Sequence, residues 1–273
     1  SYSVSGKKHF LFLLVFTCFS AIHAFAQLPQ YAWANTLRGL TSDFSLTNSS
    51  GVEDITYDAA GNIYTVGHFY GSIDANPGSG TLSLAAEESG IRAFVIKSSP
   101  TGSLIWAKSF QGDGTNEAFA VRVDANGNVY FTGRFSETVD FNPGSGTFNM
   151  TTAAYYDMYM EKLDSSGNFV WAKKISSSSF IQPSKMEIDT DGNPIYVGYF
   201  SGTADFNPNT GATSLTGSSN SFILKLDPSG NFVFVKQFVS TSSNFIQDIV
   251  LKANGDMVLG GYFTSATDFD PNA

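Results

Sequence analysis

Paired oxygen side chains recur in four loops of this sequence. In each loop an Asp is separated by one residue from an Asn or a second Asp, and Pro follows directly. The pairs, whose segments we call the DF loops, are Asp74 and Asn76, Asp140 and Asn142, Asp205 and Asn207, and Asp268 and Asp270. Carboxylate and amide oxygens coordinate calcium and accept hydrogen bonds from sugar hydroxyls, so each loop is a candidate cation or glycan site. The alternative, which we favour, is structural: Asp starts a turn, the intervening Phe packs inward and Pro bends the chain.

A second group of oxygen side chains lies in tight turns. The segments DANGN from Asp124 and DTDGN from Asp189 place oxygens at the first, third and fifth positions, as calcium loops do. Such a loop also carries Glu at its twelfth position, where Phe200 stands when counted from Asp189. The matching segment from Asp58 has Ala60 at its third position. We therefore interpret these segments as turns and predict no resident cofactor, with calcium in the DF loops as the alternative.

No side chain is singled out as catalytic. His68 is a candidate general base, but the repeats described below put other residue types at the equivalent position, namely Arg134, Tyr199 and Tyr262. We therefore interpret His68 as an ordinary strand residue. The repeats look interchangeable, which argues against an active site confined to one of them. Trp33, Trp106 and Trp171 are candidates for stacking on sugars, although their recurrence on the outermost strand favours packing between repeats.

The elements that carry these residues belong to one repeated unit. Its clearest marker is a turn followed by a strand, as in DANGNVYFTGRF, and the turn glycines are Gly61, Gly127, Gly192 and Gly255. They follow one another at steps of 66, 65 and 63 residues, and the first Asp of each DF loop keeps the same steps. Two independent markers with one period indicate tandem structural units, as in a solenoid or a propeller.

Each unit is predicted to contain four strands. In the second unit they cover 118–124, 128–135, 157–164 and 168–175, joined pairwise by type I turns that end in a left-handed Gly. A further glycine recurs six residues after each turn glycine, where a side chain would obstruct a close backbone approach: Gly67, Gly133, Gly198 and Gly261. Aromatic residues at 15%, charged residues at 14% and 26 glycines suit short strands and tight turns. No segment after residue 26 has a helical period, so we predict an all-β fold.

The ordered elements DxxGNxYxxGxF, a DF loop, FxxKLDxxGN and WAK resemble the secreted bacterial seven-bladed β-propeller repeat family. The resemblance covers about residues 30–273 and implies a β-propeller scaffold of four-stranded antiparallel blades, of which this chain is expected to be a fragment. The predicted parts are an orphan outer strand and loop (30–51), three blades (52–110, 117–175 and 182–239) and a partial fourth blade (246–273). Within the orphan part, Tyr31 to Leu37 is expected to complete the last blade of the whole ring. Departures such as Phe234 in place of Trp look like tolerated packing variation.

The first 26 residues are predicted to be a secretory signal peptide. Lys7 and Lys8 precede an apolar run from Phe10 to Ile22, and small residues prepare cleavage after Ala26. A retained membrane anchor is disfavoured because the run is shorter than the roughly 20 residues that a span needs. We expect a secreted or cell-surface protein with no transmembrane span after cleavage. Cleavage would also remove the single cysteine, Cys18, and with it any disulfide.

Charge narrows the range of partners. Removal of the leader takes away two lysines and no acid, which changes the net charge from −9 to −11. An acidic chain is not expected to bind nucleic acid, and glycans or extracellular proteins are the candidate partners. The long connections between second and third strands, about 70–92, 136–156 and 201–221, are the expected binding loops. We predict a binding or structural scaffold; the alternative is a polysaccharide hydrolase or lyase with its site at the mouth of the propeller channel.

Overall fold

The computed structural model describes residues 37–39, 50–86, 90–153 and 155–270. The regular secondary structure in these ranges consists of β-strands, which confirms the all-β prediction. The predicted signal peptide and most of the predicted orphan strand, Tyr31 to Leu37, lie outside the described residues. In the described ranges there is no helix long and apolar enough to cross a membrane.

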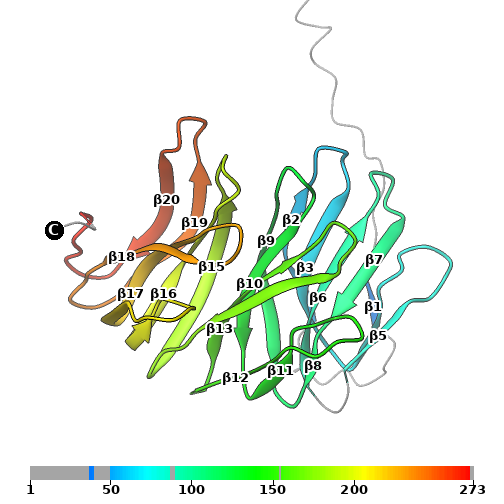
Figure 1. The fold of residues 1–273 in the computed structure, drawn as a ribbon, viewed down its shortest axis with the longest axis horizontal. Helices are drawn as coiled ribbons and strands as arrows, with labels where there is room; N and C mark the ends of the chain where they lie inside the picture. The colour runs from blue at the N-terminus through cyan, green and yellow to red at the C-terminus, as the bar shows by residue number, and fades with distance from the viewer. Residues whose placement is uncertain (1–36, 40–49, 87–89, 154, 271–273) are drawn as a thin grey trace, which may run out of the picture. The chain divides into compact units, whose positions relative to one another are not determined.

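Four antiparallel sheets follow one another along the chain (Figure 1). Sheet I contains β2 (Gly51–Tyr57), β3 (Ile63–Tyr70), β6 (Ile91–Ser98) and β7 (Leu104–Ser109). Sheet II contains β9 (Asn116–Val123), β10 (Val129–Phe135), β13 (Asp157–Leu163) and β14 (Phe169–Ile175). Sheet III contains β15 (Phe180–Ile188), β16 (Pro194–Asp205), β17 (Ser214–Leu226) and β18 (Phe232–Phe238), and sheet IV contains β19 (Asn244–Leu251) and β20 (Met257–Phe263). Within each sheet these strands pair with their neighbours in the sequence, and the strands of sheet II confirm the four predicted for the second unit to within two residues.

The tight turns have the predicted geometry. In the turn between β9 and β10, Gly127 is left-handed with φ of 79°, and its N–H donates to the Asp124 carbonyl oxygen at 2.9 Å. The Asp124 carboxylate accepts two further backbone N–H groups, from Asn126 and Asn128, each at 2.9 Å. The turn aspartates therefore hold their hairpins together through their own oxygens. Equivalent turns in the other sheets also end in a left-handed Gly, but Ser99 and Lys252 replace the Asp in the β6–β7 and β19–β20 turns.

The connections between second and third strands are more regular than loops. They contain two-stranded ribbons made of β4 (Ser72–Asp74) with β5 (Ser83–Ala85) and of β11 (Thr138–Asp140) with β12 (Asn149–Thr151). The short strands β1 (Arg38–Gly39) and β8 (Gln111–Gly112) each add a third strand to one ribbon. In sheet III, β16 and β17 themselves continue into the equivalent ribbon. The segments predicted as loops are therefore partly strands, and the sequence does not reveal them because a strand of two or three residues is too short to have a visible alternating pattern.

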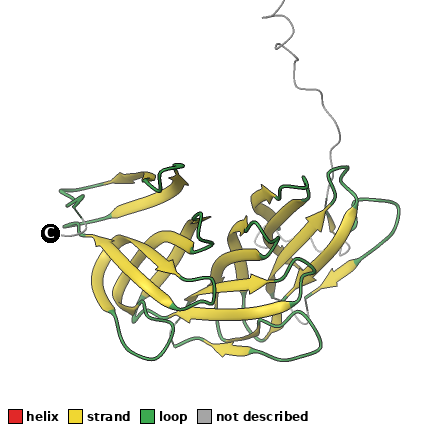
Figure 2. Cartoon of the chain, turned by 45° about the horizontal axis from the view of Figure 1, so that its top comes forward, coloured by secondary structure: helices red, strands yellow, loops and turns green. Residues whose placement is uncertain are grey.

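Successive sheets pack through buried apolar layers. One layer joins sheet I to sheet II and contains Tyr64, Val95 and Phe131, and a second joins sheet II to sheet III. At the rim, Trp171 Nε1 donates to the Pro228 carbonyl oxygen in the next sheet at 3.2 Å, and Trp106 makes the same contact one sheet earlier. The prediction that these tryptophans pack between repeats is confirmed. Contacts also run between the first strands of neighbouring sheets, β2 with β9, β9 with β15 and β15 with β19. Figure 2 shows that strands and loops make up the described part of the chain.

Candidate functional site

The DF loops use their oxygens to fold themselves. Asp140 Oδ1 accepts the backbone N–H groups of Asn142 at 2.9 Å and Phe148 at 2.7 Å, and Asn142 Oδ1 accepts that of Gly144 at 2.9 Å. Phe141, between the two, is fully buried. In the other three loops, Oδ1 of the first Asp likewise accepts the backbone N–H two residues later. The distances are 2.9 Å from Asn76 to Asp74, 3.1 Å from Asn207 to Asp205 and 2.8 Å from Asp270 to Asp268.

These hydrogen bonds explain why the DF loop recurs, because the loop uses them to fold. Ligand binding at the eight oxygen-bearing residues of the DF loops stays a prediction. In the part of the chain that the structure describes, no three side chains of His, Cys, Asp or Glu gather as a metal ion would need. Calcium in the DF loops likewise stays a prediction.

A different set of residues comes together on the first strand of each sheet. In all four sheets this strand contains a β-bulge opposite the recurring strand glycine, so one extra residue interrupts the ladder. The extra residues are Glu53 in β2, Phe119 in β9, Ser184 in β15 and Gln247 in β19. The bulge also explains the glycine: a β-carbon on Gly133 would overlap the Glu117 carbonyl oxygen, and equivalent overlaps occur in the other sheets. The predicted close backbone approach at this glycine is therefore confirmed.

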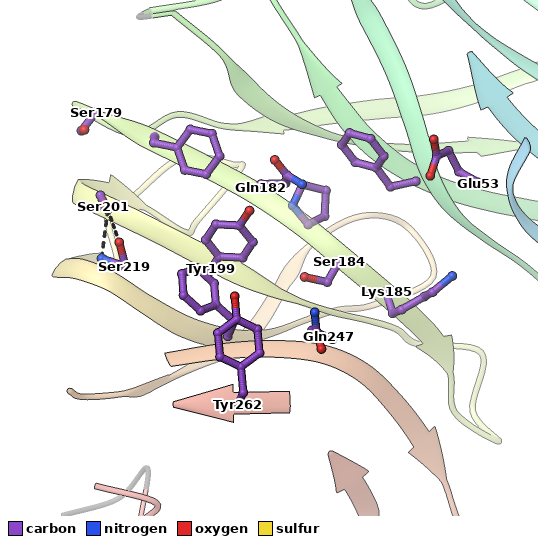
Figure 3. A pocket seen from close by; sticks show the side chains of 14 residues that line it. Glu53, Ser179, Gln182, Ser184, Lys185, Tyr199, Ser201, Ser219, Gln247 and Tyr262 are labelled. Atoms are coloured by element: carbon purple, nitrogen blue, oxygen red, sulfur yellow. Dashed lines mark hydrogen bonds between the residues drawn. The ribbon is translucent and has the colours of Figure 1, made fainter. Parts of the chain in front are cut away.

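The four bulge residues line one cavity of about 800 Å³. Other lining residues come mainly from β15 and from the neighbouring strands of sheets III and IV. Figure 3 shows Tyr199, Tyr262, Gln247 and Ser184 gathered around one part of the cavity, with Glu53 and Lys185 toward the other. A cavity of this size suits a ligand of a few rings.

The position directly after the strand glycine flanks the bulge residues. Its occupants are His68, Arg134, Tyr199 and Tyr262, as the sequence comparison placed them. His68 Nδ1 lies 3.5 Å from Glu53 Oε1, the Arg134 guanidinium lies 5.6 Å from the ring centre of Phe119, and both tyrosines line the cavity. The expectation that the repeats are interchangeable is wrong here, because each sheet presents a different pair of side chains.

Aromatic rings form a continuous row along one side of the cavity. The ring centres of Phe180 and Tyr199 are 5.6 Å apart, those of Tyr199 and Phe245 are 4.5 Å apart, and those of Phe245 and Tyr262 are 5.0 Å apart. Burial raises the pKa of the Tyr199 hydroxyl; the positive charge of Arg134 opposes this shift and Tyr262 adds to it, leaving the pKa raised. The Tyr199 hydroxyl is therefore a neutral donor at physiological pH.

An ion network braces the same strands. Asp54, the residue after the bulge in β2, binds Lys185 Nζ at 3.0 Å and Arg122 Nη1 at 2.9 Å. Arg122 also contacts Glu187 at 3.1 Å, so the network links sheets I, II and III. Among the described residues, two charged ones line the cavity, Lys185 and Glu53. Lys185 belongs to this network through its ion pair with Asp54, and Glu53 does not belong to it.

The bulge residues were missed in the sequence because no pattern of residue type marks them. Their position does have a signal, since each precedes its strand glycine by fourteen residues. A glycine that recurs inside a strand indicates a bulge in the paired strand, and the bulge residue is then found by counting back.

Comparisons with known proteins agree with a repeat architecture. No family model matches the chain. The chain is similar to the uncharacterized WD repeat-containing protein L264 of Acanthamoeba polyphaga mimivirus, with 25% identity over 195 residues. The match covers 62% of this chain and 14% of that protein, so the chain spans a small part of its length. WD repeats form four-stranded propeller blades, and the similarity therefore supports a repeat protein of the β-propeller type.

Proposed function

We propose that the chain is a β-propeller repeat module that serves as a binding scaffold, with sheets I to III as blades and sheet IV as part of a fourth. Three observations support it: the repeated four-stranded antiparallel sheet, the contacts between the first strands of successive sheets, and the similarity to a WD repeat-containing protein. We further propose that the protein is secreted or held at the cell surface, for which the leader sequence is the support.

The proposed binding site is the cavity lined by the bulges. The observation that carries it is the convergence of four bulge residues, one from each sheet and each of a different type, on one cavity. A scaffold that repeats its backbone and varies the side chains that face one cavity is suited to recognising a ligand. The net negative charge of the chain argues against nucleic acid, which leaves glycans and proteins as the candidate partners.

A second candidate function is catalysis on a polysaccharide, as a hydrolase or a lyase. It is favoured by Glu53 and His68, whose side chains lie 3.5 Å apart. Among the four sheets, sheet I alone has this pair of residue types at these two positions. A carboxylate beside an imidazole is a plausible acid–base pair for proton abstraction. Glycoside hydrolysis commonly needs two carboxylates facing the scissile bond, whereas Glu53 is the one carboxylate among the described residues that line the cavity. We therefore place binding first.

The binding site can be tested with a mixed library of small molecules and saturation-transfer NMR. Ser184→Trp fills the cavity from a bulge position and should remove the signals of cavity ligands, while a matched Ser229→Trp in an exposed turn should leave them. Signals that survive Ser184→Trp would exclude the cavity as the site. Running each sample with and without calcium, and with Asp140→Ala and Asp205→Ala, tests the DF loops in the same experiment.

A further inference from the structure

Residues that recur in every sheet can be separated from residues that do not. The strand glycine and the turn glycine recur because the backbone geometry of each sheet requires them. The aromatic row does not recur: Phe245 of sheet IV corresponds to Gly51, Glu117 and Gln182 in sheets I to III. Likewise Phe180 of sheet III corresponds to Thr115 and Ser243 in sheets II and IV. The scaffold itself does not need these rings, so their presence beside the cavity calls for another explanation.

Around Tyr199 and Tyr262 the cavity lining is aromatic and uncharged, while the charged lining residues Glu53 and Lys185 lie toward the other part of the cavity. The rings of Tyr199, Phe245 and Tyr262 offer apolar surface, and Tyr262 is 51% exposed. Ser184, Gln247 and Gln182 supply uncharged donors and acceptors next to them. The Gln182 side-chain oxygen accepts a hydrogen bond from Arg134 at 3.1 Å, which leaves its amide N–H groups as donors.

Sugar rings match this combination. A pyranose has an apolar C–H face, which packs on an aromatic ring, and a rim of hydroxyls, which exchange hydrogen bonds with amides and hydroxyls. The charges nearby disfavour an acidic ligand, because Lys185 is paired with Asp54 at 3.0 Å and Glu53 is negative.

An extended peptide matches the cavity less well. The strands β2, β9, β15 and β19 are edge strands of their sheets, and a peptide would bind such an edge by extending its hydrogen-bond ladder. Each of these edges is interrupted by a bulge at the cavity, which disrupts the ladder that the peptide would need. The bulges instead direct side chains into the cavity, as recognition of a small molecule requires.

We propose that the cavity binds a neutral oligosaccharide, with sugar rings on Tyr199, Phe245 and Tyr262 and hydroxyls hydrogen-bonded to Ser184 and Gln247. The proposal rests on the proposed function of a binding scaffold and names the ligand class of that same site. The aromatic row is long enough to contact more than one ring, so di- and trisaccharides should bind more tightly than the matching monosaccharides.

The test is isothermal titration of the purified chain with maltotriose, cellotriose, mannotriose and triacetylchitotriose, with trigalacturonate as the acidic comparison. Ser184→Trp should abolish binding of any neutral trisaccharide that binds, and Tyr262→Ala should weaken it about tenfold through loss of one stacked ring. Tyr57→Ala is the matched control, because Tyr57 is 77% exposed and lies outside the cavity. Thermal unfolding of each variant verifies that the fold is retained.

The outcomes separate the ligand class from the site. Neutral trisaccharide binding that is lost with Ser184→Trp and kept with Tyr57→Ala supports the proposal. Saccharide binding that survives Ser184→Trp overturns it, as does a preference for trigalacturonate. If a library of short synthetic peptides binds in a manner sensitive to Ser184→Trp and no saccharide does, the saccharide class is wrong while the cavity remains a binding site. If neither class binds, both this inference and the proposed site fail.

Discussion

Glu161 offers the sharpest test of the energetics of this fold. It lies in β13 of sheet II, is fully buried, and neither carboxylate oxygen has a hydrogen-bond partner among the described residues. The equivalent positions, each directly before the Lys near the end of the third strand, are Ile96 in sheet I and Leu224 in sheet III. Burial raises the pKa of Glu161 well above its ordinary value of 4.5, and the negative charge of Asp140 adds to the shift. An acid therefore occupies a position that the other two complete sheets fill with an aliphatic side chain.

The direction of the pH dependence follows from this shift. A carboxyl group whose pKa is raised by folding binds its proton more tightly in the folded state than in the unfolded state. The stabilisation of the folded state by this tighter proton binding is fully present below the ordinary pKa of 4.5. It is lost as the pH rises through the folded pKa of Glu161. Within that window each pH unit should cost about 1.4 kcal/mol of the free energy of unfolding.

Replacement of Glu161 by Leu should therefore stabilise the protein. A buried polar group without a partner costs about 1–3 kcal/mol, and a leucine of similar size would remove that cost and restore apolar contact. Glu161→Gln is the matched control, since it keeps the shape and removes the titration. We expect Glu161→Leu to be more stable than the wild type by about 1–3 kcal/mol near neutral pH, with both variants gaining on the wild type as the pH rises.

Urea unfolding of the three proteins between about pH 4.5 and pH 8 measures both quantities. A Glu161→Leu variant that is less stable than the wild type near neutral pH would show that the carboxyl group has partners that outweigh its burial. A difference between wild type and Glu161→Gln that does not change with pH would refute the raised pKa.

Three further changes test the bulge, the contacts between sheets and an ion pair. Gly133→Ala should cost about 1–3 kcal/mol of unfolding free energy because its β-carbon overlaps the bulged backbone. Gly51→Ala is the control and should cost far less, because the nearest atom to its β-carbon is 3.9 Å away. Equal losses for the two variants in urea unfolding would contradict the role of the bulge. Trp171→Phe removes the indole hydrogen bond to the next sheet and should cost about 0.5–1.5 kcal/mol; an unchanged unfolding midpoint would show that the bond does not hold the sheets together. For Asp189, burial raises the pKa, but hydrogen bonds led by that from Lys225 outweigh it and leave the pKa lowered, so the stabilisation is present above the ordinary value of 3.8 and lost as the pH falls through the folded pKa. Asp189→Asn should thus be less stable than the wild type at neutral pH. A difference in unfolding free energy that stays constant into the acid range would contradict the lowered pKa of Asp189.

The backbone of each sheet was predictable because its determinants are local. A turn such as that at Asp124 is specified by four neighbouring residues: the Asp accepts the backbone N–H groups and the Gly adopts the left-handed conformation. The glycine at Gly133 likewise predicted a close backbone approach, because only one residue type tolerates it. Repetition strengthened each of these predictions, since four copies of one pattern exclude coincidence.

The candidate site was not predictable in the same way. Oxygen side chains are dense in the DF loops, where Asp140 uses one of its oxygens to fold its own loop, as the favoured structural interpretation expects; ligand binding there stays a prediction. His68 was interpreted as an ordinary strand residue because its counterparts have no chemistry in common with it. The structure places it beside Glu53 and next to the cavity.

By itself, then, the sequence determined the repeat, the number of strands in each unit and the chemistry of the turns, all of which depend on residues close together in the chain. Only the tertiary structure decided which side chains share a cavity. Side chains alternate between the two faces of a strand, so a bulge of one residue changes which of them points inward without altering the apolar pattern. The convergence of Glu53, Phe119, Ser184 and Gln247 further depends on packing between sheets whose repeats lie more than 60 residues apart in the sequence. Long-range packing of that kind is set by the buried layers between sheets, and no short segment of the chain encodes it.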